Sequence, residues 1–219
     1  MIRRPTFSDL AWPEDPADAD LPQQWAQSVT IQVLDWTWRA FDQLHGNRLS
    51  HVDLRQPLEQ LERDLTRNHF IEIQALFRAE TDGFSTLIPV HEWPEMETRS
   101  SPPARPRAYD LGFVHLGHRR WAWPIEAKVL STPASLHDYL ADVRDKFECG
   151  VAAPLVGEGG MIGYLLSGQP DACFACLEKG LSCPLVVVPE FASRPHRASS
   201  HDRTQAPSLR LHHMVMPCS

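Results

Sequence analysis

A short apolar stretch that carries two charges constrains the fold of this chain most strongly. Residues 121–130, with the sequence WAWPIEAKVL, have the apolar and β-branched composition of a strand. Side chains in a strand alternate between two faces, so Glu126 and Lys128 share one face and the apolar residues share the other. A charge in an apolar strand costs free energy unless it is paired or bound to a metal ion. The sequence therefore predicts partners for Glu126 and Lys128.

Hairpin geometry suggests Asp110 as one of these partners. Residues 109–114 form a second candidate strand, and a short turn separates it from the strand described above. If that turn is centred on His118, the antiparallel register places Asp110 opposite Glu126 on the same face. Pro124 cannot donate a hydrogen bond to a neighbouring strand, so we expect an edge position or a bulge just before Glu126. Such a bulge would alter the register on which this convergence depends.

The remaining pattern alternates between helices and strands, which predicts an α/β domain with a mixed sheet. Residues 1–20 contain several prolines and an acidic cluster, and we expect an irregular N-terminal arm there. Residues 21–219 would form a single domain, with its core at about residues 57–190. The near-continuous apolar run at residues 185–188 predicts a central strand covered on both faces. Helices are expected at 21–46, 57–78, 132–150 and 171–179, and strands at 84–90, 109–114, 121–130, 161–166, 185–188 and 209–216.

Composition bounds the class of protein. A chain of 219 residues that is 42% hydrophobic and 22% charged is long enough to bury a substantial core. We expect no membrane partner and a cytoplasmic location, because no apolar run approaches the roughly 20 residues that span a bilayer. The net charge of −7 argues against a generally basic protein that coats nucleic acid.

The five cysteines are an odd number, which fits a reducing compartment better than a disulfide framework. Cys173 and Cys176 form a C-x-x-C motif, and Cys183 follows. A zinc site is one interpretation of this motif, and small core cysteines on a helix are the other. The second pair of ligands at motif-like spacing is missing, which favours the core interpretation.

Fifteen residues separate Asp110 from Glu126, and one residue separates Glu126 from Lys128. This spacing resembles the signature of the PD-(D/E)XK nuclease superfamily. The resemblance covers residues 57–166 and implies the restriction-endonuclease-like fold, a mixed central β-sheet flanked by helices. In that fold an acidic residue on a helix precedes the hairpin. Glu62 fits this position, because it falls within about 50° of the centre of the apolar stripe of its helix.

This resemblance implies a metal-dependent endonuclease that hydrolyses phosphodiester bonds of nucleic acid, DNA more than RNA. Its catalytic residues would be Asp110, Glu126, Lys128 and Glu62. The three carboxylates would bind Mg²⁺ or Mn²⁺, Glu62 directly or through water. Lys128 would position or help deprotonate the attacking water and offset charge in the transition state. Such nucleases often belong to prokaryotic restriction or anti-phage systems.

Basic side chains elsewhere in the chain are candidate phosphate contacts. Arg144 and Lys146 lie on the helix after the hairpin, where a solvated charged face is the alternative. His201 and Arg203 belong to a basic, polar segment at residues 193–203, and we expect them beside the substrate phosphate. The acidic net charge suggests that a homodimer or a partner protein helps to grip nucleic acid.

Two other interpretations remain open. The charged residues could form a buried ion network without activity, in a nuclease-like binding or assembly module. A histidine-based hydrolase could instead use His196, His201, His212 or His213. His212 and His213 are adjacent on a predicted strand and so face opposite ways, which argues against a metal ion shared by these two.

Overall fold

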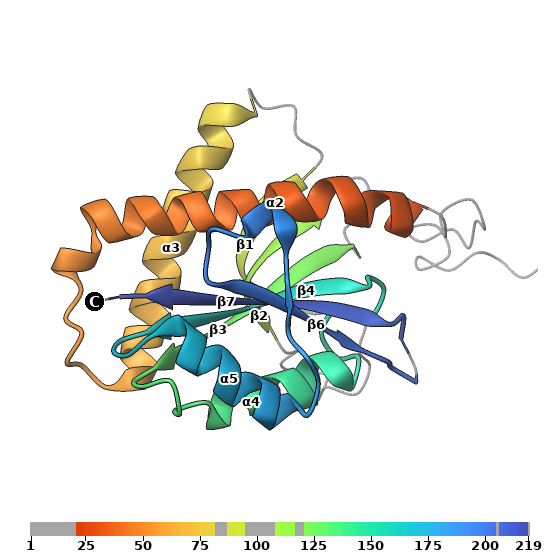
Figure 1. Cartoon of the computed structure of the whole chain (residues 1–219). Coiled ribbons are helices and arrows are strands. Elements are labelled where there is room, and N and C mark those ends of the chain that lie inside the picture. The colour runs from red at the N-terminus through yellow and green to blue at the C-terminus, as the bar shows by residue number, and fades with distance from the viewer. Residues whose placement is uncertain (1–20, 82–86, 95–107, 117–120, 205, 219) are drawn as a thin grey trace, which may run out of the picture.

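A seven-stranded mixed sheet runs through the described part of the chain in the computed structural model (Figure 1). This part comprises residues 21–81, 87–94, 108–116, 121–204 and 206–218, with side chains from residue 29 onward. The predicted arm at residues 1–20 lies outside it. The strands lie in the order β1-β2-β3-β4-β7-β6-β5. Their bounds are β1 Leu87–Pro94, β2 Ala108–His115, β3 Ala122–Leu130, β4 Glu158–Leu165, β5 Val186–Val187, β6 His196–His201 and β7 Leu209–Pro217.

Strand directions divide the sheet into three parts. The first three strands, β1, β2 and β3, form an antiparallel meander. The centre is parallel, because β3 pairs with β4 and β4 pairs with β7 in the same direction. The far edge is antiparallel again, through β6 and β5. The expectation of an α/β protein with a mixed sheet is therefore confirmed.

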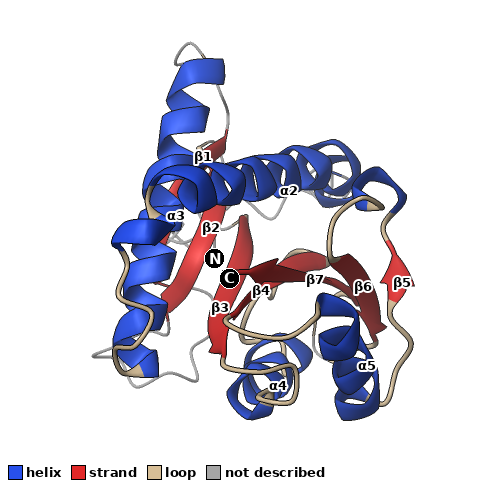
Figure 2. Ribbon diagram, turned by 60° about the vertical axis from the view of Figure 1, so that its left-hand side comes forward, coloured by secondary structure: helices blue, strands red, loops and turns tan. Residues whose placement is uncertain are grey.

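Helices cover both faces of the sheet (Figures 1 and 2). The helices α2 (Leu21–Asn47) and α3 (Leu58–Glu80) pack on one face. The other face is covered by α4 (His137–Asp142), the π-helical segment η3 (Val143–Glu148) and α5 (Pro170–Leu181). Short 3-10 helices form at η2 (Leu49–His51) and η4 (Pro189–Phe191). None of the described helices is long and apolar enough to cross a membrane.

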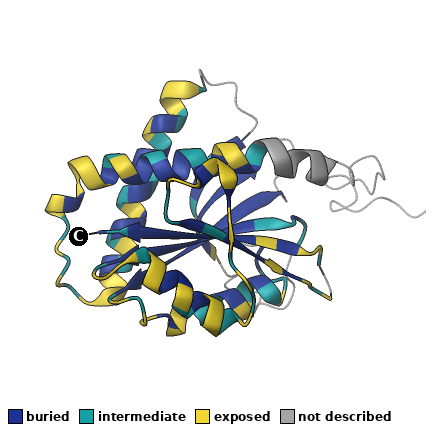
Figure 3. Cartoon of the chain, in the orientation of Figure 1, coloured by how far each residue is buried: buried dark blue, intermediate teal, exposed yellow. Residues whose placement is uncertain are grey.

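Each face of the sheet has its own hydrophobic core (Figure 3). Alternation along β3 sends Trp123, Ile125 and Ala127 into the core beneath α2 and α3. Leu130 joins the opposite core, with Tyr139 of α4. Glu126 and Lys128 therefore project toward the face that α4 covers.

The prediction of a bulge or edge position at Pro124 is wrong. Pro124 pairs with Gly112 in a continuous register, and β3 lies between β2 and β4. Backbone bonds alternate in an antiparallel ladder, and the His115 N–H donates to the Trp121 carbonyl at 3.0 Å. Pro124 therefore falls in a non-hydrogen-bonded pair and needs no donor toward β2. Pairing with β4 begins one residue later, at Ile125, so the missing donor leaves no gap on that side either.

Near the C-terminus one prediction needs correction, and one strand was not predicted. The apolar run at 185–188 does not form a central strand, because β5 lies at the sheet edge, where Val186 and Val187 are 51% and 50% exposed. The basic segment at residues 193–203 contains the strand β6, which the polar composition concealed. Its buried polar side chains, including Ser199, are hydrogen-bonded inside the fold.

Most other element predictions hold, with shifted ends. The first two helices and the strands of the hairpin, β4 and β7 form where the pattern predicts them. Residues 84–86 of the first predicted strand lie outside the described residues, and β1 continues to Pro94. The helix expected from residue 132 begins only at His137, after a series of turns.

Candidate active site

The hairpin brings Asp110 and Glu126 together. Register pairing between β2 and β3 ends at Leu111 and Ile125, which makes Asp110 and Glu126 the next opposed residues. They fall in a non-hydrogen-bonded pair, where side chains lie closest. The Ala127 N–H donates to Oδ2 of Asp110 at 2.8 Å, so a carboxylate takes the place of a strand carbonyl. The expected register is confirmed.

Glu126 is the most deeply buried acid of this group, with 1% of its surface exposed. Burial raises the pKa of Glu126 well above its ordinary value, and the charge of Asp110 raises it further. The ammonium group of Lys146 opposes this rise, at 2.7 Å from Oε2 of Glu126. Glu126 therefore holds a proton more readily than an ordinary glutamate does.

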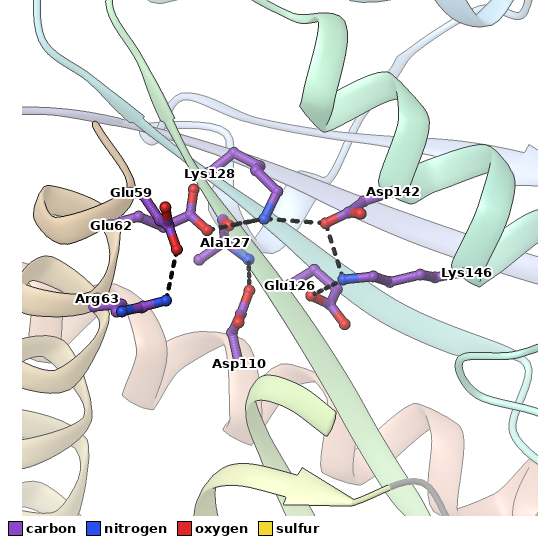
Figure 4. Close-up of polar contacts among 9 residues, drawn as sticks. All are labelled: Glu59, Glu62, Arg63, Asp110, Glu126, Ala127, Lys128, Asp142 and Lys146. Carbon is purple, nitrogen blue, oxygen red and sulfur yellow. Dashed lines mark hydrogen bonds and ion pairs between the residues drawn. The ribbon is translucent and has the colours of Figure 1, made fainter. Parts of the chain in front are cut away.

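Lys128 joins the sheet to the start of α3. Its Nζ donates to Oε1 of Glu62 at 2.9 Å and to the Ala127 carbonyl at 3.0 Å, and lies 3.1 Å from Oδ2 of Asp142 (Figure 4). Burial alone would lower the pKa of Lys128, but the charges of Glu62, Asp110 and Asp142 together raise it. Lys128 is therefore an ammonium ion at neutral pH.

Glu62 reaches this group from the second turn of α3. Burial raises the pKa of Glu62, although Lys128 acts in the opposite direction. The neighbouring Glu59 points elsewhere and pairs with Arg63 on the exposed side of the helix, at 2.6 Å (Figure 4). Glu62, close to the centre of the apolar stripe, is thus the acid of α3 that contacts the sheet, whereas Glu59 is not.

Asp142 and Lys146 complete the cluster, and sequence reasoning missed their role in it. Lys146 Nζ donates to Asp142 Oδ2 at 3.0 Å, and the same oxygen contacts Lys128. Lys146 belongs to the π-helical segment, in which Cys149 N–H donates to the carbonyl of Arg144, five residues back. Such segments are rare and often occur at functional sites. The four-residue spacing of Asp142 and Lys146, on the helix after the E-x-K strand, was the available signal.

The charge of the cluster suits a divalent cation. Four carboxylates (Glu62, Asp110, Glu126 and Asp142) face two ammonium groups, so the formal balance is 2 − 4 = −2 when all are ionised. Oxygen donors of this type are the ligands that Mg²⁺ and Mn²⁺ prefer. Asp110, Glu126 and the Ala127 carbonyl, with Glu62 nearby, supply them. Among the described residues, no three His, Cys, Asp or Glu side chains already stand in metal-binding geometry.

A cleft of about 490 Å³ opens beside the Lys128–Glu62 pair. Leu58 and Glu62 of α3 form one wall, and Ser131, Ser135 and Tyr139 form another. Such a cleft is large enough to admit a small polar group to the charged cluster from solvent.

Three of the predicted phosphate contacts have partners outside the cluster. Arg144 donates to the Gly180 carbonyl at 2.8 Å. His201 pairs through Nδ1 with Glu148 at 2.9 Å. Arg203 donates to four backbone carbonyls, three of them between residues 147 and 156. A role for these side chains in nucleic-acid binding stays a prediction, as it does for Lys146.

The other three candidate histidines, His196, His212 and His213, are buried. His212 Nδ1 lies 3.0 Å from His196 Nε2, whereas His213 lies between the hydroxyl groups of Tyr139 and Ser199, at 2.9 and 2.7 Å. The expectation that His212 and His213 face opposite ways is confirmed. Burial lowers the pKa of His196 and of His213 to about 3, so both rings are neutral at physiological pH.

The C-x-x-C cysteines lie on α5. Cys173 is fully buried, and Cys176 is partly exposed one turn later. Both are free thiols, as is Cys183 beyond the end of the helix. The position of Cys173 agrees with the interpretation of a small core residue.

The chain matches no model of a known protein family, no curated protein sequence and no solved structure. A functional conclusion must therefore come from the geometry and chemistry of the site itself.

Proposed function

We propose that the protein is a divalent-metal-dependent nuclease that hydrolyses phosphodiester bonds, with DNA favoured over RNA. The observation that carries this proposal is the opposition of Asp110 and Glu126 across the hairpin, with Lys128 beside them and in contact with Glu62. The chain order α3, β1, β2, β3, α4 and β4 supports it, because this order is the one that the restriction-endonuclease-like fold requires. A place in restriction or anti-phage defence follows only from that resemblance.

The acidic residues have a common role in this proposal. Asp110, Glu126 and the Ala127 carbonyl would hold Mg²⁺ or Mn²⁺, and Glu62 would do so directly or through water. The cation, when bound, supplies Lewis-acid polarisation of the scissile phosphate. Because Glu62 and Glu126 both have raised pKa values, they must lose their protons before they can serve as ligands.

Lys128 has a different role. Its raised pKa keeps it charged, so it acts as a fixed positive charge and not as the base that deprotonates water. From its position above Ala127, the ammonium group would orient the attacking water and offset negative charge on the phosphate in the transition state. Asp142 holds Lys128 in place at 3.1 Å.

Cleavage of plasmid DNA and of RNA by the purified protein tests this proposal, with Mg²⁺, Mn²⁺ or EDTA present. We expect cleavage that requires the metal ion and prefers DNA. Asp110→Asn and Lys128→Met should each lower the rate by about a hundredfold or more. Lys179→Met is the matched control, because Lys179 is an exposed lysine on α5. Metal-dependent cleavage that survives both site substitutions would refute the assignment.

A specific observation also favours the alternative of an inactive binding or assembly module. Each ammonium group of the cluster already has carboxylate partners within 3.1 Å, so the network is satisfied without a metal ion. This alternative predicts no cleavage by the wild-type protein with either ion. It also predicts that Lys128→Met lowers thermal stability, because the substitution leaves the Glu62 carboxylate without its ammonium partner.

The net charge of −7 supports assistance from a second copy or a partner protein in gripping nucleic acid.

A further inference from the structure

Lys146 holds the buried carboxylate that the proposed metal ion would need. Its ammonium group lies 2.7 Å from Oε2 of Glu126, which is 1% exposed. The Lys146 side chain itself is 21% exposed and comes from the π-helical segment. The contact closes an ion pair between the helix layer and the sheet.

Lys146 has a second carboxylate within reach. Asp142, one turn earlier, accepts from the same ammonium group at 3.0 Å and also contacts Lys128 at 3.1 Å (Figure 4). If Lys146 left Glu126, it would keep an ionic partner without crossing the cluster. Asp142 is therefore an alternative ion-pair partner for Lys146.

We propose that Lys146 is an internal counter-ion that competes with the divalent cation for Glu126. The idea rests on the proposed function, because it assumes that Glu126 is a metal ligand. Two positive charges a few ångströms apart in a poorly solvated site repel each other strongly. A cation that binds Glu126 therefore displaces Lys146, which stays paired with Asp142. Without the cation, Lys146 prevents an isolated charge at Glu126 from destabilising the fold.

Metal binding in the absence of nucleic acid tests the competition. Lys146→Met and Lys128→Met change the charge of the cluster by the same amount, but only Lys146 contacts Glu126. Titration calorimetry with Mn²⁺ should show binding about tenfold tighter for Lys146→Met than for wild type, and a smaller gain for Lys128→Met. Lys179→Met should leave the affinity unchanged. Equal gains for Lys146→Met and Lys128→Met would mean a general charge effect and would overturn the proposal.

A second measurement records the response to the metal ion in the wild-type protein itself. The chain has three lysines, so the ¹⁵N spectrum holds at most three lysine ammonium signals, and Lys146→Met and Lys179→Met identify two of them. Addition of Mg²⁺ to the wild-type protein should shift or broaden the Lys146 signal and leave that of Lys179 in place. A Lys146 signal that stays unchanged while calorimetry records binding would overturn the competition.

The two proposals fail in distinguishable ways. Metal binding with the expected response of Lys146 but no cleavage of DNA or RNA would refute the nuclease and leave the competition intact. Cleavage and binding without a response of Lys146 would refute the competition alone. If neither the wild-type protein nor any of the three lysine variants binds Mn²⁺ or Mg²⁺, both proposals are wrong.

Discussion

Asp110 faces Glu126 across the non-hydrogen-bonded pair that follows the last paired residues of β2 and β3. Burial raises the pKa of Glu126, and the opposed carboxylate adds to that rise. The hairpin therefore holds Glu126 in a place where it ionises less readily than in water. A cluster of this kind destabilises the folded protein as the pH increases, unless a cation compensates for the charge.

Glu126→Gln should make the protein more stable above neutral pH in EDTA. The folded pKa of Glu126 exceeds its unfolded value, so the folded state binds more protons. The free energy of unfolding then falls as the pH rises from about 4.3 through the folded pKa. Glutamine removes this loss, and each 1 kcal/mol regained raises the melting temperature by about 2–4 °C. Thermal unfolding of both proteins at pH 5 and pH 8 measures this difference in stability. Glu190→Gln, at an exposed position, is the control. Parallel profiles for wild type and Glu126→Gln would contradict the prediction.

Glu158→Gln should remove a second pH-dependent loss, at the contact between α2 and β4. Burial raises the pKa of Glu158 to about 7, although Arg210 lowers it, and the Thr30 hydroxyl donates to its carboxyl group. The folded pKa again exceeds the unfolded one, so stability declines as the pH rises from about 4.3 through 7. Urea unfolding at pH 5.5 and 8.5 should show a smaller difference for the variant than for wild type. An unchanged difference would show that Glu158 ionises as easily in the fold as in water.

His69→Ala should lower the free energy of unfolding by about 2–4 kcal/mol at pH 7. The buried ring joins three elements, since Nε2–H donates to the Thr37 carbonyl at 2.8 Å and Nδ1 accepts from the Tyr164 hydroxyl at 2.9 Å. Burial lowers the pKa of His69 from 6.5 to about 4. This depressed pKa means that wild type loses stability as the pH falls from 6.5 through 4, and the variant should lose less. Denaturant unfolding at pH 7 and pH 4.5 measures both effects. Tyr164→Phe, which removes one bond, should cost about 1 kcal/mol at pH 7.

Gly159→Ala should disturb the cluster indirectly, through Phe147 in the segment that carries Lys146. A Cβ at this position would lie 2.7 Å from the ring of Phe147, which is buried next to Lys146 in the π-helical segment. Because the ring must move within a packed core, we expect a loss of about 1–3 kcal/mol and weaker Mn²⁺ binding. Gly46→Ala is the matched control, since nothing lies within 4 Å of its Cβ, and should add about 0.5–1 kcal/mol. Chemical denaturation and calorimetry measure the two effects. A neutral Gly159→Ala would mean that Phe147 moves freely.

The hairpin could be predicted because its register depends on local rules. Turn length and strand alternation place Asp110 opposite Glu126, and helical periodicity selects Glu62. Pro124 misled the prediction, because the effect of a missing donor depends on which neighbour the nitrogen faces. That orientation is fixed by pairing and not by the residue type.

The four-residue spacing of Asp142 and Lys146 puts them on one side of their helix but does not show that this side faces the cluster. Lys146 lies in a π-helical segment that begins directly after Asp142, and helical periodicity does not predict such a segment. Charges on an amphipathic helix otherwise indicate a solvated face. In the same way, Val186 and Val187 suggested a central strand, because apolar composition does not reveal which side of a sheet lacks a neighbour.

Arg203 holds the segment between the π helix and β4 through hydrogen bonds to backbone carbonyls. Its guanidinium group donates to the carbonyls of Phe147, Ala152 and Val156, and to that of Pro207. One side chain from the C-terminal hairpin thus fastens a stretch in which no helix or strand forms between residues 149 and 157. The π helix, this stretch and the β6–β7 hairpin should consequently open as one cooperative unit in native-state hydrogen exchange. Arg203 in this way links the β6–β7 hairpin to the segment that carries Lys146.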